Sequence, residues 1–422
     1  MRMIAATPGD LDVILGNVRV PASLVADAAA FGGRRDGDCL AGNLVIRGGK
    51  IAGLTDAPAD VDTGGRLVTM PFVEPHCHLD KCFTGNRLDS PARTLAEAIA
   101  AQSKDKRHWT RDDLRTRAQR GLEELHAAGA QIVRTHVDWD VEPSDPERLP
   151  TAWRVLEELR EEWRGRIAIQ RSALLPIEVM ADETYTNIVA RLIAASGCVM
   201  GAFVHGQPDR RAGIRNMVNA AARHGIALDF HVDEGLCDSL DGLEIIAEEV
   251  AAAGHAGPVL CGHACNLASL TSDARRNRIE LVARAGLSVV SLPTSNLYLQ
   301  DRGGDMPRLR GLTSVRELME AGVNTVFGTD NVQDAFCPLG VHSPAAALSL
   351  AVLAAQLPPP VSYWLPTVMT DAARALGCDM APVDRSDASG LLLWQTSDPA
   401  ALLSDGRGRW QSIAGFVSAA TS

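Results

Sequence analysis

Eight short apolar runs alternate with longer amphipathic stretches between about residues 67 and 356. This alternation predicts parallel strands, because parallel neighbours need a connection long enough to contain a helix. Eight repeats favour a closed (β/α)8 barrel, and the Gly-x-Gly-x-x-Gly loop expected of an open doubly wound sheet does not follow the first run. The predicted strands are 67–72, 131–137, 166–174, 198–204, 227–232, 258–263, 287–292 and 324–329.

Amphipathic stretches with recognisable ends lie between these runs. The stretch 110–130 begins at Thr110, whose hydroxyl can cap a helix, has Asp113 three residues later, and reaches Gly129, which can end the helix. The other stretches also close on a glycine before the next apolar run. They are 214–225, 240–254, 273–286 and 313–322.

Both ends of the chain have a different pattern from the centre. Their apolar runs are short, are punctuated by Gly and Asp, and lack helical periodicity, which predicts strands. These runs are 11–20, 43–56 and 64–70 near the start, and 390–404 and 408–419 near the end.

Since both ends share this style, we predict one small β module formed by residues 1–66 and 382–422, beside a barrel domain formed by residues 67–381. The run 25–40 is expected to be a loop insertion within the module. A chain of 422 residues is long enough for one large barrel with such an accessory module.

Charge and apolar composition restrict the partners of the chain. Its 41 basic and 52 acidic residues give a net charge of -11 without a concentrated tail, which argues against a nucleic-acid partner. No stretch approaches the roughly 18 uninterrupted apolar residues of a membrane span, and the first 20 residues lack the apolar core of a secretory signal. Nine cysteines without a Cys-x-x-Cys pair fit a reducing compartment. We therefore expect a cytoplasmic protein with no membrane partner.

Side chains of the metal-ligand type stand at the carboxyl ends of the predicted strands. In a barrel these ends surround one central depression, so residues far apart in sequence can meet there. His76 and His78 are two residues apart, so they project from the same face of an extended segment. The others are His136, His231, His263 and Asp330. Any one alone would more often be an ordinary hydrogen-bonded residue, but six at one end predict a shared site.

Imidazole and carboxylate groups in this number suit a divalent metal. Three histidines and one carboxylate form a reasonable ligand set for Zn²⁺ or Fe²⁺ and leave a position for water. Such a metal lowers the pKa of its water from about 15.7 towards about 7. Glu234, three residues after His231, is placed to transfer protons there, although a turn glutamate can also have no role.

Five segments, PFVEPHCHLDK, VRTHVD, FHVDE, GHAC and FGTDNVQDAFCPLG, occur in this order over about residues 65–345. The set resembles the amidohydrolase superfamily, and specifically its cytosine deaminase branch. The resemblance implies a barrel with a β-sandwich built from both termini. It also implies that the metal ligands are His76, His78, His231 and Asp330.

The resemblance also implies a reaction. Two-metal members of the superfamily commonly use a carbamylated lysine from the fourth strand, but the run 198–204 has no lysine and none follows Lys106, so we expect a single metal. The implied reaction is hydrolytic deamination with release of ammonia through a metal-bound hydroxide. Asp330 would accept the proton of the attacking water and His263 would orient the hydroxide. Glu234 would protonate the ring nitrogen and then the leaving amine.

Departures from the branch bear on the substrate. Asn331 stands where cytosine deaminases carry a second aspartate that contacts the pyrimidine, and Phe336 stands where the bacterial enzyme has a tryptophan a few residues later. Gln170 is the candidate for a substrate-binding glutamine, and it aligns only with a shift. Lys81 lies either at the pocket mouth or on the surface, and His136 is expected to have a structural role. We predict a small, cytosine-like amino-substituted N-heterocycle as substrate and, since relatives usually assemble, a homo-oligomer.

Two other functions stay open at this point. An amidohydrolase of this kind could instead cleave a cyclic amide or an N-alkylamino substituent, as on a triazine, and product analysis would separate these reactions. A noncatalytic scaffold homologue would be expected to have lost ligands or the acid–base pair, but the residues named above are all present.

Overall fold

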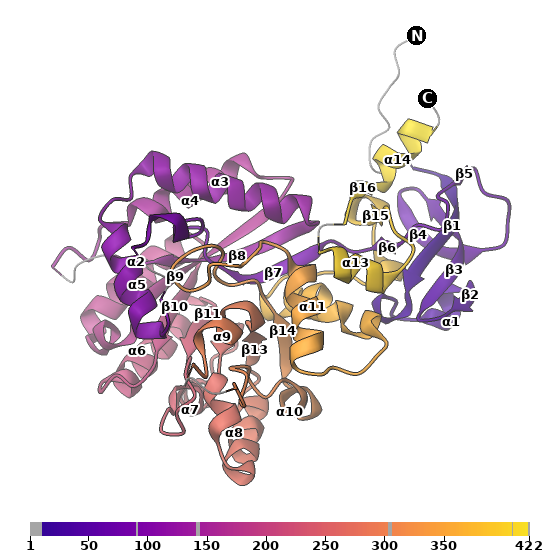
Figure 1. Cartoon of the computed structure of the whole chain (residues 1–422). Helices are drawn as coiled ribbons and strands as arrows, with labels where there is room; N and C mark the ends of the chain where they lie inside the picture. Colours follow the sequence, from indigo (N-terminus) through magenta and orange to yellow (C-terminus); the bar gives the residue numbers. More distant parts are fainter. Residues whose placement is uncertain (1–10, 90–91, 141–143, 303–305, 407, 421–422) are drawn as a thin grey trace.

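Eight parallel strands form the centre of the molecule (Figure 1). Each strand pairs with the next one along the chain, from β7 to β14, and helices lie around them, which confirms the predicted (β/α)8 barrel. The computed structural model describes residues 11–89, 92–140, 144–302, 306–406 and 408–420. The barrel strands are β7 (Phe72–Cys77), β8 (Ala130–Asp138), β9 (Ala168–Pro176), β10 (Val199–Val204), β11 (Leu228–Val232), β12 (Val259–His263), β13 (Ser288–Ser291) and β14 (Asn324–Phe327).

The barrel closes between β7 and β14 beside a buried carboxylate. Glu74 of β7 accepts hydrogen bonds from the backbone N–H of Thr329 at 3.1 Å and of His76 at 2.9 Å. The backbone N–H of Asp330 donates to the carbonyl oxygen of His76 at 2.8 Å. The first and last strands are therefore joined at the residues for which the sequence predicts metal binding.

The first barrel strand begins later than predicted. The expected strand 67–72 is divided, because Val68–Thr69 forms β6 and pairs with β15 (Leu392–Trp394), whereas β7 starts at Phe72 and pairs with β8. Pro71 separates the two pieces and has no N–H to donate to either sheet. As a result His76 lies within β7 rather than after it.

Helices surround the barrel, and several have the ends that the sequence predicts. The hydroxyl of Thr110 caps α3 (Arg111–Ala127) by accepting the N–H of Asp113 at 3.2 Å. Gly225 ends α6 (Arg210–His224) and Gly254 ends α7 (Gly242–Ala253), each in the left-handed conformation that glycine adopts readily. The other helices of this region are α2 (Leu95–Lys106), α4 (Thr151–Glu162), α5 (Glu183–Ala195), α8 (Ser272–Arg284), α9 (Pro293–Leu299), α10 (Val315–Glu320), α11 (Pro344–Ala354) and α12 (Thr370–Ala375).

Short 3-10 helices connect many of these elements. They are η2 (Ala22–Leu24), η3 (Gly85–Arg87), η4 (Ile177–Ala181), η5 (Cys265–Ser269), η6 (Val361–Val368), η7 (Val383–Arg385) and η8 (Ala388–Gly390). The connections η3 and η5 follow the barrel strands β7 and β12, on the side where the predicted site lies.

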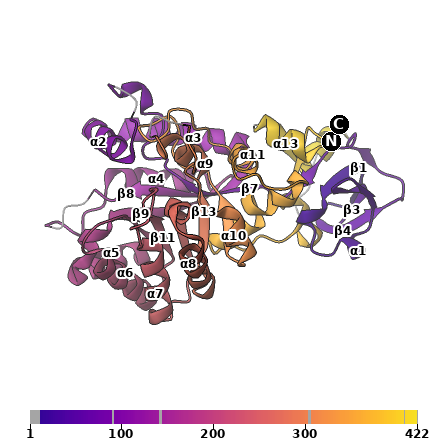
Figure 2. The same cartoon turned by 60° about the horizontal axis from the view of Figure 1, so that its bottom comes forward.

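Both ends of the chain meet beside the barrel (Figures 1 and 2). One sheet has the order β2-β3-β1-β5, with β4 also paired to β3, and a smaller sheet joins β6 to β15 and β16. Segments from the start and the end of the chain therefore share a sheet. The boundaries predicted at 66/67 and 381/382 stay a prediction. The elements are β1 (Val13–Pro21), α1 (Ala28–Phe31), β2 (Arg34–Asp36), β3 (Cys39–Arg47), β4 (Lys50–Thr55), β5 (Val61–Asp62), α13 (Pro399–Asp405), β16 (Trp410–Ser412) and α14 (Ile413–Ala420).

The run 25–40 is not the plain loop that the sequence suggested. It contains α1 and β2, because Asp27 caps the short helix by accepting the N–H of Ala30 at 3.0 Å and Phe31 is buried in the core. Such a short helix has too little periodicity to be seen in the sequence.

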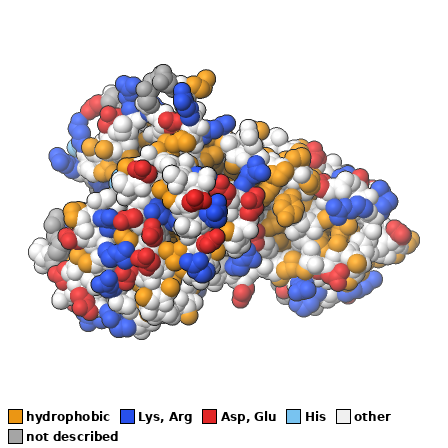
Figure 3. Space-filling model, turned by 90° about the horizontal axis from the view of Figure 1, so that it is seen from below, with side chains coloured by type: hydrophobic (Ala, Val, Ile, Leu, Met, Phe, Trp, Pro, Cys, Tyr) orange, Lys and Arg blue, Asp and Glu red, His pale blue; other side chains and the backbone are white. Residues whose placement is uncertain are grey.

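Surface charge is mixed rather than segregated on the face shown in Figure 3. Basic and acidic side chains are interspersed over the barrel, and hydrophobic side chains gather towards the junction with the β module. Among the described residues, no helix combines the length and apolar character needed to cross a membrane. The expectation about a secretory signal falls partly on residues 1–10, which lie outside the described residues.

Candidate active site

A cavity of about 300 Å³ opens at the carboxyl ends of the barrel strands. A volume of this order suits a small molecule. Histidines from three strands contribute to its polar side, whereas aromatic and aliphatic side chains form much of the rest. The histidines are His78, His231 and His263, and the apolar group comprises Leu95, Ile99, Trp139, Leu174, Leu175, Pro176, Phe203 and Phe336.

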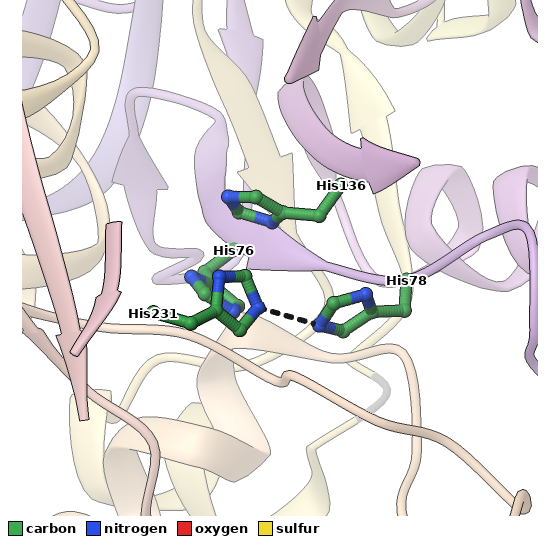
Figure 4. Close-up of side chains that lie close together, drawn as sticks. All are labelled: His76, His78, His136 and His231. Atoms are coloured by element: carbon green, nitrogen blue, oxygen red, sulfur yellow. Dashed lines mark hydrogen bonds between the residues drawn. The ribbon is translucent and has the colours of Figure 1, made fainter. Parts of the chain in front are cut away.

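Three imidazoles converge beside this cavity (Figure 4). The Nε2 atoms of His78 and His231 lie 3.1 Å apart, and the ring centroids of His76 and His231 lie 4.4 Å apart. All three side chains are buried. Burial lowers the pKa of each imidazole, so each is neutral near pH 7 and offers a lone pair.

The carboxylate of Asp330 faces the same imidazoles. Its Oδ1 lies 3.2 Å from Nε2 of His78 and 3.5 Å from Nε2 of His76, while its Oδ2 accepts a hydrogen bond from the hydroxyl of Ser295. Among the described residues, Oδ1 of Asp330 and Nε2 of His76 are buried without a hydrogen-bond partner. A buried carboxylate oxygen facing neutral imidazole lone pairs is costly unless a cation lies between them. Ligand atoms of His76, His78, His136 and His231 lie within 4.8 Å of one another, and so do those of His76, His263 and Asp330. Imidazole and carboxylate donors placed in this way fit a divalent metal such as Zn²⁺ or Fe²⁺.

Two residues of this centre have an unusual backbone. His263 and Asp330 have φ angles of 67° and 58°, in the left-handed region that residues other than glycine rarely adopt. Strain of this kind persists where the surrounding structure holds it, and it is concentrated at functional sites.

His136 lies next to this group but is held by another partner. Its ring centroid is 4.0 Å from that of His76, and its Nε2 lies 3.1 Å from Oδ1 of Asp229. Arg134 donates to the other oxygen of Asp229 at 2.9 Å. Although burial raises the pKa of Asp229, His136 and Arg134 lower it to about 2. Arg134 and Asp229 thus form a buried ion pair beside His136, whose ring also lies within ligand distance of His76, His78 and His231, and the structural role of His136 stays a prediction.

Gln170 is not brought to the cavity. Its Oε1 accepts a hydrogen bond from Arg134 at 2.8 Å, and its Nε2 donates to the carbonyl oxygen of Leu376 at 3.4 Å. Gln170 lies near the start of β9, whereas the cavity contacts Leu174 and Leu175 near the end of that strand. Gln170 therefore lies four residues before Leu174, away from the cavity.

Glu234, His263 and Asn296 form a buried hydrogen-bonded group beside the metal-type ligands. Asn296 Nδ2 donates to Nδ1 of His263 at 3.0 Å and lies 3.4 Å from Oε1 of Glu234. Because an amide nitrogen only donates, Nδ1 of His263 is the acceptor, and the single proton of the neutral ring is on Nε2. Burial lowers the pKa of His263 to about 4.

The environment of Glu234 favours the protonated form of its carboxyl group. Burial, reinforced by the nearby charge of Asp330, raises the pKa of Glu234 well above its usual value. The side chain lines the cavity and is only 6% exposed. Glu234 can therefore give a proton to a bound molecule near neutral pH.

Sequence reasoning missed Ser295 and Asn296. Both belong to α9, which directly follows β13. The sequence had predicted no metal-ligand residue after β13 or after β10. Neither residue type titrates, so the search for imidazoles and carboxylates could not find them. The pattern of polar residues after successive strands was the available signal.

Asn331, Phe336 and Lys81 lie on the wall of the cavity. Lys81 is 4% exposed, and its ammonium group binds Oδ1 of Asp138 at 2.7 Å. Lys106, at the end of α2, binds the other oxygen of Asp138 at 2.5 Å. Lys81 is therefore a buried cavity residue and not a surface residue.

Three comparisons with known proteins agree on the kind of enzyme. The sequence model of the Amidohydrolase family matches residues 180–356. Pterin deaminase of Rhizobium rhizogenes is 32% identical over 378 residues, which cover 88% of this chain and 85% of that protein. N-isopropylammelide isopropyl amidohydrolase of Pseudomonas sp. is 25% identical over 295 residues, which cover 67% of each chain.

Solved structures give the same picture. The crystal structure of 5-methylcytosine deaminase from Klebsiella pneumoniae, liganded with phosphonocytosine, superposes with a TM-score of 0.77 at 28% sequence identity. The superposition covers 94% of this chain and 95% of that chain. The similarity therefore extends over the barrel and the β module together.

Proposed function

The chain belongs to the amidohydrolase family as a hydrolytic deaminase of nitrogen heterocycles, and we propose that its substrate is a small amino-oxo ring of the pterin or cytosine type. The observation that carries this proposal is the buried Glu234 beside His263 in a cavity of about 300 Å³, where burial raises the pKa of its carboxyl group well above the usual value. A deaminase of this kind must protonate a ring nitrogen while water attacks the adjacent carbon, and Glu234 has the proton and the position to do so.

We further propose that one divalent metal ion is held by His76, His78, His231 and Asp330. Their neutral imidazole nitrogens and the unpaired carboxylate oxygen support this assignment. A bound ion supplies the Lewis acidity that makes water nucleophilic near neutral pH. β10 contains no lysine that could be carbamylated to bridge two ions, so a single ion is proposed, with Zn²⁺ and Fe²⁺ both suited to the ligands.

The acid–base residues then have distinct tasks. Asp330 accepts the proton of the attacking water through Oδ2, which keeps a lone pair beside the hydrogen bond from Ser295, while Oδ1 faces the imidazoles. His263 presents its Nε2–H as a hydrogen-bond donor that orients the attacking oxygen, because Asn296 holds the proton on that nitrogen. Glu234 protonates the ring nitrogen, and its carboxylate then takes the proton of the hydroxyl group on the attacked carbon and passes it to the departing amine. The proton held by Asp330 returns to Glu234, so both residues regain their starting states. The products are ammonia and the oxo-substituted ring.

The walls of the cavity suit a flat ring. Trp139, Phe203 and Phe336 provide apolar faces for the ring, while Lys81 provides a donor for a ring carbonyl oxygen. Lys81 keeps hydrogens free for a ligand, since an ammonium group has three and Asp138 takes one. A ring with both an amino and an oxo substituent uses these groups and the acid Glu234 together.

Ammonia release from purified, metal-loaded protein tests the proposal. The panel contains pterin, cytosine, 5-methylcytosine and N-isopropylammelide, and ammonia and isopropylamine are measured separately. We expect ammonia and the deaminated ring in equal amounts from at least one of the first three compounds. The 25% identical relative makes removal of an alkylamine the second candidate, and isopropylamine as the sole product would replace our proposal with that reaction.

A further inference from the structure

The side-chain amide of Asn331 is held in one orientation by a second buried residue. Asn331 lines the cavity, and its Nδ2 donates a hydrogen bond of 2.6 Å to Oδ2 of Asp334. The other oxygen of Asp334 accepts the backbone N–H groups of Phe336 and Cys337 at 2.8 and 3.1 Å. Three donors thus point at one carboxylate, and Asp334 is fixed within its own loop.

This arrangement determines which end of the amide is offered to a ligand. A carboxylate that receives three N–H groups acts only as an acceptor, so the nitrogen of Asn331, and not its oxygen, must face Asp334. The nitrogen is therefore held at Asp334, to which it donates one of its two hydrogens, and Oδ1 is the acceptor that the amide can offer to the cavity. Neither side chain is free to turn, because both are buried, with exposures of 5% and 2%.

We propose that Asp334 is a positioning residue that directs the oxygen of Asn331 into the cavity, so that the enzyme selects heterocycles with a ring N–H donor. This inference rests on the proposed function and deepens it by specifying one edge of the substrate. An unrestrained amide would present N–H or oxygen equally well and would accept rings of either polarity. The fixed amide rejects a ring whose N–H has been replaced, because its own buried oxygen is then left without a partner.

The pairing with Glu234 narrows the substrate class further. Glu234 donates a proton and needs a ring nitrogen with a free lone pair, whereas the Asn331 oxygen needs a ring N–H. A cyclic N=C(NH₂)–NH unit next to a carbonyl group contains both. Cytosine carries its ring N–H away from the amino-bearing carbon, so 2-amino-4-oxo rings such as pterin satisfy the two residues best.

Binding of a ring that does not react tests the inference separately from turnover. Lumazine, the product expected from pterin, and its 1-methyl and 3-methyl derivatives are titrated calorimetrically into metal-loaded protein at about pH 8, because burial raises the pKa of Asp334 to about 7. The variants are Asp334→Asn, and Asp334→Asn combined with Asn331→Asp. The matched control is Asp384→Asn, since Asp384 also accepts two backbone N–H groups but lies in the β module.

We expect the variants to change the discrimination between lumazine and its methyl derivatives, and not only the affinity for lumazine. In the wild type, one of the two methyl derivatives binds about tenfold to a hundredfold more weakly than lumazine. Asp334→Asn lets the amide of Asn331 turn, so lumazine loses affinity. The ratio of the dissociation constant of that methyl derivative to that of lumazine then falls towards one. The double variant restores the ratio, because the carboxylate introduced by Asn331→Asp accepts the amide N–H of its neighbour and still offers an oxygen to the cavity. Asp384→Asn leaves the ratio unchanged.

Two outcomes would overturn the inference. It is wrong if wild-type protein binds both methyl derivatives as tightly as lumazine, or does not bind lumazine at all. It is also wrong if Asp334→Asn keeps the wild-type ratio. Ammonia release from the panel above is scored independently, so a protein that discriminates between these rings but releases no ammonia would contradict the proposed function and leave the positioning role intact.

Discussion

Replacing Glu234 by glutamine isolates proton transfer from every other contribution of this residue. Gln keeps the length of the side chain and an oxygen that accepts the hydrogen bond from Asn296, but it cannot exchange a proton. A positioned acid or base contributes about 10²- to 10⁴-fold to a rate. Because Glu234 is only 6% exposed, bulk water cannot replace it, and we expect the upper half of that range. The predicted fall in kcat is about 10³- to 10⁴-fold, equivalent to about 4–5 kcal/mol.

The assay is steady-state ammonia release by Glu234→Gln, with metal content measured on the same preparation. We expect about one ion per chain and a KM within about threefold of the wild type, because binding contacts are kept. The matched control is Glu249→Gln, a buried glutamate on α7 that pairs with Arg215 at 3.1 Å outside the cavity, and its kcat should not change. A fully metallated Glu234→Gln enzyme with kcat within about tenfold of the wild type would refute the reasoning.

Three further predictions concern the neighbours of this acid. Asn296→Leu should lower kcat about tenfold to a hundredfold with the metal retained, because His263 loses the donor that places its proton on Nε2; an unchanged kcat would contradict this. Lys81→Met should lower kcat/KM about tenfold to a hundredfold for a ring with a carbonyl group, mainly through KM, since a charged donor is lost; an equal effect on a ring without the carbonyl would contradict it. Removing the metal with a chelator should abolish ammonia release and lower the melting temperature by about 5–10 °C, with both restored by Zn²⁺; activity that survives complete metal removal would disprove a metal-dependent reaction.

The barrel could be predicted from the sequence because its strands repeat a simple pattern. Parallel strands buried on both faces are rich in apolar residues, and amphipathic helices between them end at glycines such as Gly225 and Gly254. The pattern could not show where one apolar run serves two sheets. Residues 67–72 look like a single strand, but pairing with β15, which lies near the other end of the chain, takes Val68 and Thr69 into another sheet.

The candidate site was predictable to the extent that its members are titratable. Histidines and carboxylates are rare at buried strand ends, so His231 or Asp330 attracts notice in the sequence. Asn296 and Ser295 are common polar residues whose importance comes only from the partners that the fold gives them. Gln170 shows the converse, because its residue type suited a substrate contact while its register on β9 directs it to Arg134.

The closure of the barrel through Glu74 has a consequence for how this protein is made. Glu74 and Thr329 are 255 positions apart in the chain, yet their hydrogen bond lies next to His76 and Asp330. At a synthesis rate of about 5–20 residues per second, the early histidines leave the ribosome roughly 13–50 s before the last strand exists. During that interval the nascent chain carries the histidines without Asp330, so the proposed ligand set is incomplete until the last strand has been made, and a chain truncated before β14 would lack its carboxylate.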